Sequence, residues 1–426
     1  MTYQEFFELA QSKGISNIQI TEDEKKENSI YLINNKLEDY TDCEKKVYTI
    51  KAELNGKTEN LTTEYLSESI IELILEKIHN TESNYEDEYL INKNNNIIKK
   101  IESVDVTEEI KKITDLYIQK EKFPLTKSLE IAYSDTYTKT RIINSNKVDI
   151  STDSHCYELY VEASAEKDET IATYSESLLV TDKSKIDFLN IINNVLNLTS
   201  LATVKKKLET KKYNIILSNK VASRIIDHIQ GMLSAELIHQ KKSCLINKLN
   251  EKVFSEKLNI VEEPINKEYP GYIIFDKEGT DTYNKDIITN GIIKTYLYDI
   301  KEAKIDKVKS TGNKYNGIAA RNMYIKPGNK SLSELFKDID NGIYITHYMG
   351  SMGSSINEST GNISMQVFGY IIENGNLICG FEPAVLTSSI FELLTNIEEI
   401  GSDLQFVMKS SASPSIYIKD ISIAGE

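Results

Sequence analysis

The residues best suited to metal or acid–base chemistry are scarce in this sequence, which has five histidines and four cysteines among 426 residues. Histidine nitrogens and cysteine thiolates are the usual zinc ligands, so their spacing decides whether a metal site is visible in the sequence. The cysteines lie far apart and never form CxxC, which excludes a zinc ribbon and a dense disulfide framework: Cys43, Cys156, Cys244 and Cys379. Four reduced thiols are typical of a cytosolic protein.

Two pairs of these residues lie close together in the sequence. His239 and Cys244 have no third ligand at a recognisable spacing. His155 and Cys156 lie in a segment that we expect to be a strand, where consecutive side chains face opposite sides and cannot easily share one ion. Neither pair predicts a metal site.

The segment MGSMGSS (349–355) offers small groups that can cradle a phosphate or a peptide carbonyl: Gly350, Ser351, Gly353 and Ser354. No Gly-Lys-Ser/Thr follows it and no GxGxxG opens a helix, so a nucleotide site is not indicated. A peptide cleft and a simple turn between strands remain equally good interpretations.

Carboxylates and serines elsewhere give weaker signals. Asp276, Glu278 and Asp281 cluster near a turn, where acidic side chains are usually solvated. No GxSxG elbow is present, so a serine triad of that kind is not supported.

The segment SRIIDH (223–228) is the most informative stretch. The pattern predicts a strand at residues 213–217 and a helix from Asn219 to about His239. Val221, Ile225, Ile229 and Met232 form an apolar stripe on that helix. A single histidine on such a helix, His228, is more typical of a hydrogen-bonded structural residue than of a metal ligand or a substrate contact.

The elements before this helix predict two smaller α+β units. In the first, Thr2 and Glu5 form a capping box, strands follow at 17–20, 29–34 and 47–54, and a helix covers 67–79. Residues 81–105 are polar and aperiodic, which indicates a connection. The predicted organisation is therefore an α+β subdomain at 1–80, the connection at 81–105, a central α+β subdomain at 106–210 and a β-rich domain at 211–426.

Glycine distribution separates the C-terminal region from the rest, because 15 of the 18 glycines lie at or after Gly271. Glycine supplies the positive φ angles of tight turns, so this region is expected to be rich in hairpins. Asn290-Gly291 and Asn374-Gly375 each separate two apolar runs, which predicts hairpins. The fold class expected is α+β with a largely antiparallel C-terminal β domain.

Composition limits the partners of the chain. The formal charge is −15, and an acidic surface repels phosphate backbones, so duplex nucleic acid is not expected as a partner. No window is long and apolar enough for a membrane helix, and the first residues lack a signal-peptide pattern. We therefore expect a soluble, cytoplasmic protein with no membrane partner.

Short colinear segments resemble the TldD/PmbA family of peptidase subunits and DNA gyrase modulators. They include residues 275–299, STGN (310–313), RNMYIKPG (321–328), NGIYIT (341–346) and IAGE (423–426). The resemblance covers nearly the whole chain and implies an N-terminal α/β region of two subdomains followed by the β-rich domain that is catalytic in active members.

Active TldD-type members carry HExxxH on the matching helix, with a further cysteine ligand near the C-terminus. The resemblance places Ser223 at the first histidine, Arg224 at the glutamate, His228 at the second histidine and Ser413 at the cysteine. A hydroxyl is a poor zinc ligand, and a guanidinium opposes a divalent ion and accepts no proton from water. The sequence therefore predicts no catalytic residues and no metal or cofactor in this chain.

The resemblance implies a TldE/PmbA-like subunit. Such a chain would pair with a zinc-bearing TldD-like catalytic subunit to cleave unfolded peptides, as a homo- or hetero-oligomer. Two alternatives stay open: a metallopeptidase with displaced ligands, for instance His228 with His239 or His347, and a binding protein that regulates gyrase or another client.

Overall fold

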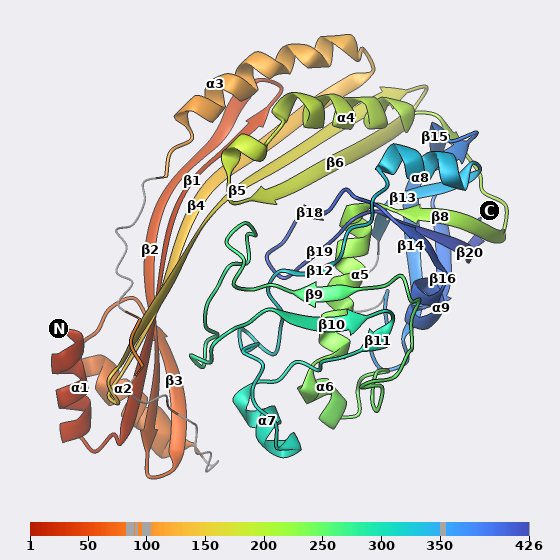
Figure 1. Cartoon of the computed structure of the whole chain (residues 1–426). Helices are drawn as coiled ribbons and strands as arrows, with labels where there is room; N and C mark the ends of the chain where they lie inside the picture. The colour runs from red at the N-terminus through yellow and green to blue at the C-terminus, as the bar shows by residue number, and fades with distance from the viewer. Residues whose placement is uncertain (82–88, 90–92, 96–103, 350–354, 426) are drawn as a thin grey trace.

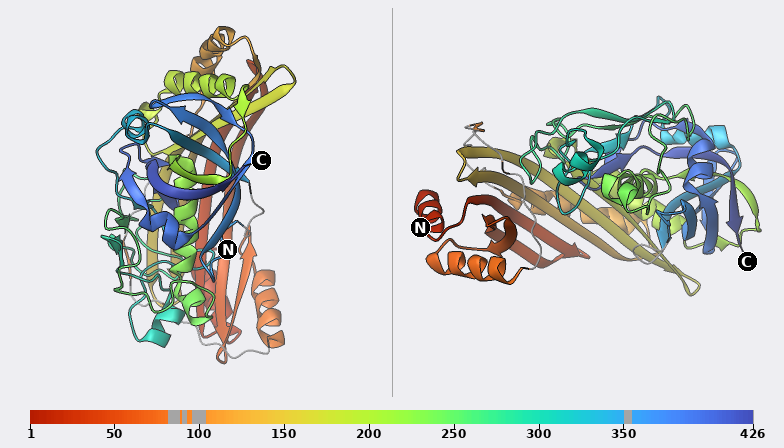
Figure 2. Two further views of the ribbon diagram at one scale, coloured as in Figure 1. Left: turned by 90° about the vertical axis from the view of Figure 1, so that its right-hand side faces the viewer. Right: turned by 90° about the horizontal axis from the view of Figure 1, so that it is seen from below.

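The computed structural model describes residues 1–81, 89, 93–95, 104–349 and 355–425. One long, curved sheet arches beside a C-terminal part in which two further sheets surround the helix α5 (Asn219–Met232) (Figure 1). The N-terminus lies at one end of the arch, and the C-terminus lies at the opposite end of the molecule (Figure 2).

In the described residues, six antiparallel strands form the long sheet, in the order β3-β2-β1-β4-β5-β6. Their bounds are β1 (Asn17–Ile33), β2 (Lys36–Leu54), β3 (Lys57–Thr63), β4 (Thr126–Asn144), β5 (Val148–Lys167) and β6 (Thr170–Val180). β1 pairs with β4 from Gln19 to Ile33. The predicted subdomains at 1–80 and 106–210 therefore share one sheet.

β1 is a single strand, where the apolar pattern had predicted two strands separated by the charged segment 21–28. Cross-strand ion pairs explain the difference. Lys46 lies 3.0 Å from Glu22 and 2.7 Å from Glu24, and Asp23 accepts a hydrogen bond from Thr140 at 2.6 Å. Opposite charges on facing strands stabilise pairing where no apolar alternation exists.

The two ends of the long sheet have separate hydrophobic cores. Helices α1 (Tyr3–Ser12) and α2 (Glu68–Asn80) cover the end nearer the N-terminus. The other end packs against α3 (Thr107–Leu116), the 3-10 turn η1 (Tyr117–Lys122) and α4 (Phe188–Leu201), with a second turn, η2 (Lys183–Lys185), before α4 (Figure 1). The capping box predicted at Thr2 and Glu5 is confirmed.

The C-terminal part contains a small sheet in the order β11-β10-β9-β12-β19-β18. Its strands are β9 (Ile260–Glu262), β10 (Lys285–Thr289), β11 (Ile292–Ile293), β12 (Met323–Ile325), β18 (Gln405–Phe406) and β19 (Ser411–Ser413). Two short helices flank it, α6 (Ala235–His239) and α7 (Ile300–Asp306).

The remaining strands form the third sheet of the described residues, in the order β13-β8-β20-β16-β14-β15-β7, with β17 beside β20. They are β7 (Lys205–Lys206), β8 (Lys211–Leu217), β13 (Gly342–Met349), β14 (Asn362–Glu373), β15 (Asn376–Phe381), β16 (Ala384–Ser389), β17 (Ile397–Ile400) and β20 (Ile416–Ala424), and helices α8 (Leu332–Ile339) and α9 (Ile390–Thr395) lie in their connections. β14 also pairs with β13, so β13, β8, β20, β16 and β14 close into a ring.

Glycine is required where this ring closes. A Cβ atom at Gly369 would lie 1.9 Å from the carbonyl oxygen of Tyr344, on the paired strand. Any larger residue would therefore push β14 away from β13.

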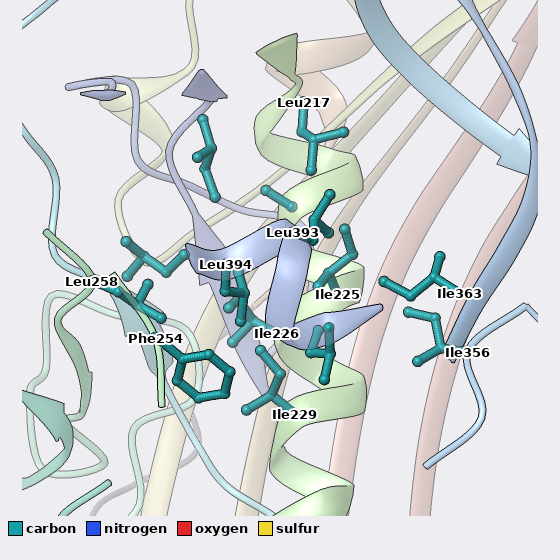
Figure 3. Close-up of a cluster of buried hydrophobic side chains, with 14 of the residues drawn as sticks. Leu217, Ile225, Ile226, Ile229, Phe254, Leu258, Ile356, Ile363, Leu393 and Leu394 are labelled. Carbon is teal, nitrogen blue, oxygen red and sulfur yellow. The ribbon is translucent and has the colours of Figure 1, made fainter. Parts of the chain in front are cut away.

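Helix α5 lies between the small sheet and the ring, and its apolar face forms the centre of the C-terminal core. Figure 3 shows Ile225, Ile226 and Ile229 pointing toward Leu393, Leu394 and Phe254. The single helix predicted from 219 to about 239 is divided, because Leu233 and Ala235 exchange backbone hydrogen bonds with Leu297 and the chain restarts as α6.

The predicted hairpin turns are confirmed. Asn290-Gly291 and Asn374-Gly375 both have positive φ angles, as type I′ turns require. Apart from three parallel pairs (β8 with β13, β12 with β19, β7 with β15), the described strands pair antiparallel, which confirms the α+β class with a largely antiparallel C-terminal domain. No described helix is long and apolar enough to cross a membrane.

Candidate functional site

The candidate site is built on α5, which follows directly from strand β8 of the ring. Ser218 caps the helix, since its hydroxyl accepts a hydrogen bond from the backbone N–H of Val221 at 3.3 Å. Ser218 N–H donates to the carbonyl of Ile345 on β13 at 2.9 Å. The start of the helix is thereby fixed to the ring.

The motif residues of α5 face different surroundings. Ser223 is fully buried, and its hydroxyl donates to the Asn219 carbonyl at 2.7 Å. Arg224 is exposed. His228 is half-buried, and its Nδ1 lies 3.8 Å from Oε1 of Glu358. A Cβ atom at Gly231 would lie 2.9 Å from the same Glu358 oxygen, so glycine allows the carboxylate to approach the helix.

Asp227, which the sequence reasoning missed, connects α5 to β19. Its Oδ1 accepts hydrogen bonds from the hydroxyls of Ser410 at 2.7 Å and Ser411 at 3.1 Å, and from Gln230 Nε2 at 2.5 Å. The Ser411 hydroxyl also lies 3.2 Å from the Ser223 carbonyl. The i, i+3 spacing to Gln230 was visible in the sequence, but the serines lie more than 180 residues away.

Ser413, predicted to replace a cysteine ligand, lies on β19, the strand that packs against α5. Its side chain is fully buried, and its hydroxyl donates to the Pro414 carbonyl at 2.7 Å.

The first two turns of α5 carry two cations, Lys220 and Arg224. Lys220 Nζ donates to the Ser175 carbonyl and lies 3.6 Å from Oε2 of Glu176. His347 lies on β13, and burial lowers its pKa, with the charges of Arg224 and Lys220 acting in the same direction. His347 is therefore held in its neutral form beside two cations.

The donor set of α5 does not fit a catalytic zinc ion, which usually takes three protein ligands and a water molecule. The Ser223 hydroxyl already donates to a backbone carbonyl inside the helix, and Arg224 is a cation without acceptor capacity. Within the described ranges, no three histidine, cysteine, aspartate or glutamate side chains form a group that could hold a metal ion.

The other histidines have separate partners. His239 Nδ1 lies 2.5 Å from Glu302 and its Nε2 lies 3.0 Å from Asp306, and the hydrogen bond with Glu302 raises its pKa. Its two ring nitrogens therefore face carboxylates on opposite sides of the ring. His155 pairs with Asp135 at 2.5 Å, whereas the thiol of the adjacent Cys156 faces the Pro270 carbonyl.

The interpretation of the carboxylates near 276–281 as solvated was wrong for Asp276, and Glu278 is half-buried. Asp276 is 1% exposed, and it accepts hydrogen bonds from the backbone N–H groups of Glu278, Thr280 and Lys314. Burial raises the pKa of Asp276 to about 6 and that of Glu278 to about 7. Asp281 is exposed and pairs with Lys93 at 2.6 Å. The backbone N–H of Ile300, at the start of α7, donates to Glu278 Oε2 at 2.9 Å.

A second buried network joins the segments that carried the family resemblance. Glu262, fully buried on β9, accepts hydrogen bonds from Lys285 Nζ at 2.7 Å, from Asn313 Nδ2 at 2.8 Å and from the Arg321 N–H at 2.9 Å. Each of these polar groups has a hydrogen-bond partner, so the network holds the strands of the small sheet beside α5 in place. The segments STGN and RNMYIKPG therefore meet at a structural carboxylate.

The predicted cleft residues Gly350, Ser351, Gly353 and Ser354 lie outside the described residues. They directly follow β13, the strand that carries His347.

Comparison with known proteins identifies the family. A family model of the PmbA/TldA metallopeptidase C-terminal domain matches residues 210–425, about half of the chain. The chain belongs to the PmbA/TldD family.

Curated relatives in this family are named metalloproteases, which supports a peptidase role at the level of the family. The PmbA homologue of Buchnera aphidicola subsp. Acyrthosiphon pisum is 31% identical over 220 residues, which are 52% of this chain and 48% of that protein. The match thus spans about half of that relative's length. A metalloprotease of Methanocaldococcus jannaschii is 28% identical over 369 residues, which are 81% of this chain and 80% of that protein.

Two solved structures share the whole architecture of this chain. A candidate modulator of a DNA gyrase from Thermotoga maritima has a TM-score of 0.88 and 26% identity, over 99% of this chain and 100% of that one. TldE from Thermococcus kodakarensis has a TM-score of 0.86 over 99% of both chains, and at 17% identity this likeness shows the fold alone.

Proposed function

We propose that this PmbA/TldD family chain is a non-catalytic, TldE/PmbA-like subunit. It assembles with a zinc-bearing TldD-like catalytic subunit into a cytoplasmic metallopeptidase that acts on unfolded peptides. In this proposal the present chain holds no zinc, contacts neither nucleic acid nor membrane, and helps to shape the peptide chamber.

The observation that supports this proposal is the chemistry of α5. Ser223 is buried with its hydroxyl hydrogen-bonded inside the helix, and Arg224 places a guanidinium beside it. An ion that activates water needs anionic or neutral donors and a general base, and a guanidinium provides neither. The catalytic group must then come from another chain.

Co-expression tests the proposal directly. Three preparations are made: this chain alone, the TldD-type protein of the same organism alone, and the two proteins co-expressed. Cleavage of an unfolded peptide is then measured for each preparation, with bound zinc determined by elemental analysis. We expect cleavage with the mixture, zinc in the partner, and loss of cleavage when a chelator is added.

The variant His228→Ala separates the proposal from the alternatives. Activity of the mixture and its zinc content should stay unchanged, because His228 faces Glu358 and holds no metal in this proposal. Stoichiometric zinc in the chain alone, lost in His228→Ala together with hydrolysis, would instead show a metallopeptidase with displaced ligands. Co-purification of a gyrase subunit without any TldD-type protein would favour the regulatory alternative.

A further inference from the structure

A cavity of about 330 Å³ lies between strand β6 and the C-terminal ring. β6 is an edge strand of the long sheet, and residues 171–175 form one wall. The start of α5, the end of β13 and strands β14 and β15 form the others. Its volume falls at the low end of ligand pockets, which hold about 300–1,000 Å³.

The walls combine aromatic rings with a buried cation. Tyr174, Phe368, Tyr370 and Phe381 line the cavity. Lys220 Nζ lies 4.6 Å from the centre of the Tyr174 ring, and its side chain is 16% exposed. Such walls offer an apolar surface together with a cation.

The charges around the cavity favour an anion although the chain as a whole is acidic. Lys205 and Lys220 line the cavity, and Arg224 follows Lys220 by one helical turn. Among the described residues, neither Lys205 nor Arg224 has a carboxylate within ion-pair distance. On the other side, Glu162 lines the cavity and Glu176 pairs with Lys220. Of the side chains that line the cavity, Lys205 and Lys220 are cationic and Glu162 is anionic, which leaves one positive charge, and burial lowers the pKa of His347.

We propose that this cavity binds a carboxylate group of a peptide, with the charge beside Lys205 and Lys220 and the neighbouring apolar side chain against the aromatic wall. The choice of a peptide rests on the proposed function. The single positive charge matches a carboxylate, which carries one negative charge. The carboxylate can belong to the C-terminus or to an acidic side chain, and the experiment distinguishes these sources.

Binding is measured by fluorescence anisotropy with the purified full chain and short peptides that carry an N-terminal fluorescein. The first peptide ends in phenylalanine with a free carboxylate, the second has the same sequence with an amidated end, and the third is amidated but contains glutamate before the phenylalanine. We expect the first or third peptide to bind at least tenfold more tightly than the second, and binding to weaken with salt. Equal binding of all three would overturn the proposal.

Matched variants test whether the peptide binds in this cavity. Lys205→Ala should weaken binding of the carboxylate peptide about tenfold, whereas Lys309→Ala removes an equal charge from an exposed position outside the cavity and should leave binding unchanged. Thr173→Trp adds an aromatic ring at an exposed, cavity-lining position of β6, where β propensity is high, and should block binding without unfolding the strand. Equal affinities for all of these variants would contradict the site.

The outcome of the peptide-binding experiment does not depend on the outcome of the co-expression experiment. If the mixture cleaves peptides but the chain alone binds none of the three, the cavity proposal fails and the proposed function stands. If carboxylate peptides bind but the mixture is inactive, the function fails and the binding site stands.

Discussion

Ser223 shows how a single residue changes the chemistry available to α5. Its side chain is fully enclosed, and the hydroxyl donates to the carbonyl one turn earlier. A small residue with an internal hydrogen bond fits this position. An imidazole ring requires more space, and its second nitrogen would need a partner in the core.

We predict that Ser223→His lowers the free energy of unfolding by about 1–3 kcal/mol because it overpacks the core. Ser223→Ala is the matched control and should change it by less than about 1.5 kcal/mol, since it removes one hydrogen bond. Urea denaturation followed by circular dichroism measures both variants. A Ser223→His protein as stable as the parent would show that the core around α5 is looser than its burial indicates.

Glu278 gives a pH-dependent prediction. Burial raises its pKa from 4.5 to about 7, so the folded chain holds this proton more tightly than the unfolded chain does. Its contribution to stability is therefore complete below about pH 4.5 and is lost as the pH rises through about 7. The difference between these two pKa values corresponds to at most about 3.5 kcal/mol.

Glu278→Gln removes this titration and keeps an oxygen that can accept from the Ile300 N–H, which now lies 2.9 Å from Oε2. The variant should be more stable than the parent at pH 8 and should lose less stability between pH 5 and pH 8. Thermal unfolding at several pH values measures the difference. Parallel pH curves for both proteins would refute a buried, protonated Glu278.

At the scale of the elements, the Asp227 carboxylate connects α5 to β19, because it accepts hydrogen bonds from the hydroxyls of Ser410 and Ser411. Charge-assisted hydrogen bonds are stronger than neutral ones. We predict that Asp227→Asn lowers the free energy of unfolding by about 1–3 kcal/mol.

Asp338→Asn provides the control for this change. Asp338 is 39% exposed and pairs with Lys330 on the surface, so its loss should cost less than about 1 kcal/mol. Chemical denaturation compares the two variants. Equal effects would mean that the α5–β19 connection depends on apolar packing and not on the carboxylate.

Local sequence patterns predicted some elements well. Turns at Asn290-Gly291 and Asn374-Gly375 depend on two residues that tolerate positive φ, so short-range information is sufficient. β1 was predicted as two strands because its charged middle has no apolar alternation, and its continuity depends on Lys46 of the neighbouring strand. Likewise, α5 ends at Met232 because Leu297, 65 residues later, pairs with the backbone beyond it.

At the scale of the whole molecule, two hydrophobic cores connect different sets of elements, and this difference predicts how the chain unfolds. One core contains Leu196 on α4 together with Tyr344 and Tyr417 from the ring, so it joins the long sheet to the C-terminal part. The other, which includes Ile71, belongs to the end of the sheet nearer the N-terminus.

Leu196 and Ile71 are both fully buried. Leu196→Ala and Ile71→Ala should each lower the local free energy of unfolding by about 2–5 kcal/mol. Hydrogen exchange followed by mass spectrometry should show faster exchange across the long sheet and the ring for Leu196→Ala. For Ile71→Ala it should show faster exchange mainly in α1, α2 and the strands beneath them. Identical exchange patterns would mean that the molecule unfolds as one unit.

Residue identity by itself determined that positions 223 and 224 carry a hydroxyl and a guanidinium, and it determined the hairpin turns and the family, because donor chemistry and φ preferences belong to individual residues. Only the tertiary structure decided which carboxylates are buried, how α5 is attached to β19, and where Lys205 and Lys220 meet an aromatic wall. Those features depend on contacts between segments far apart in the chain, and burial exists only after these segments have packed together.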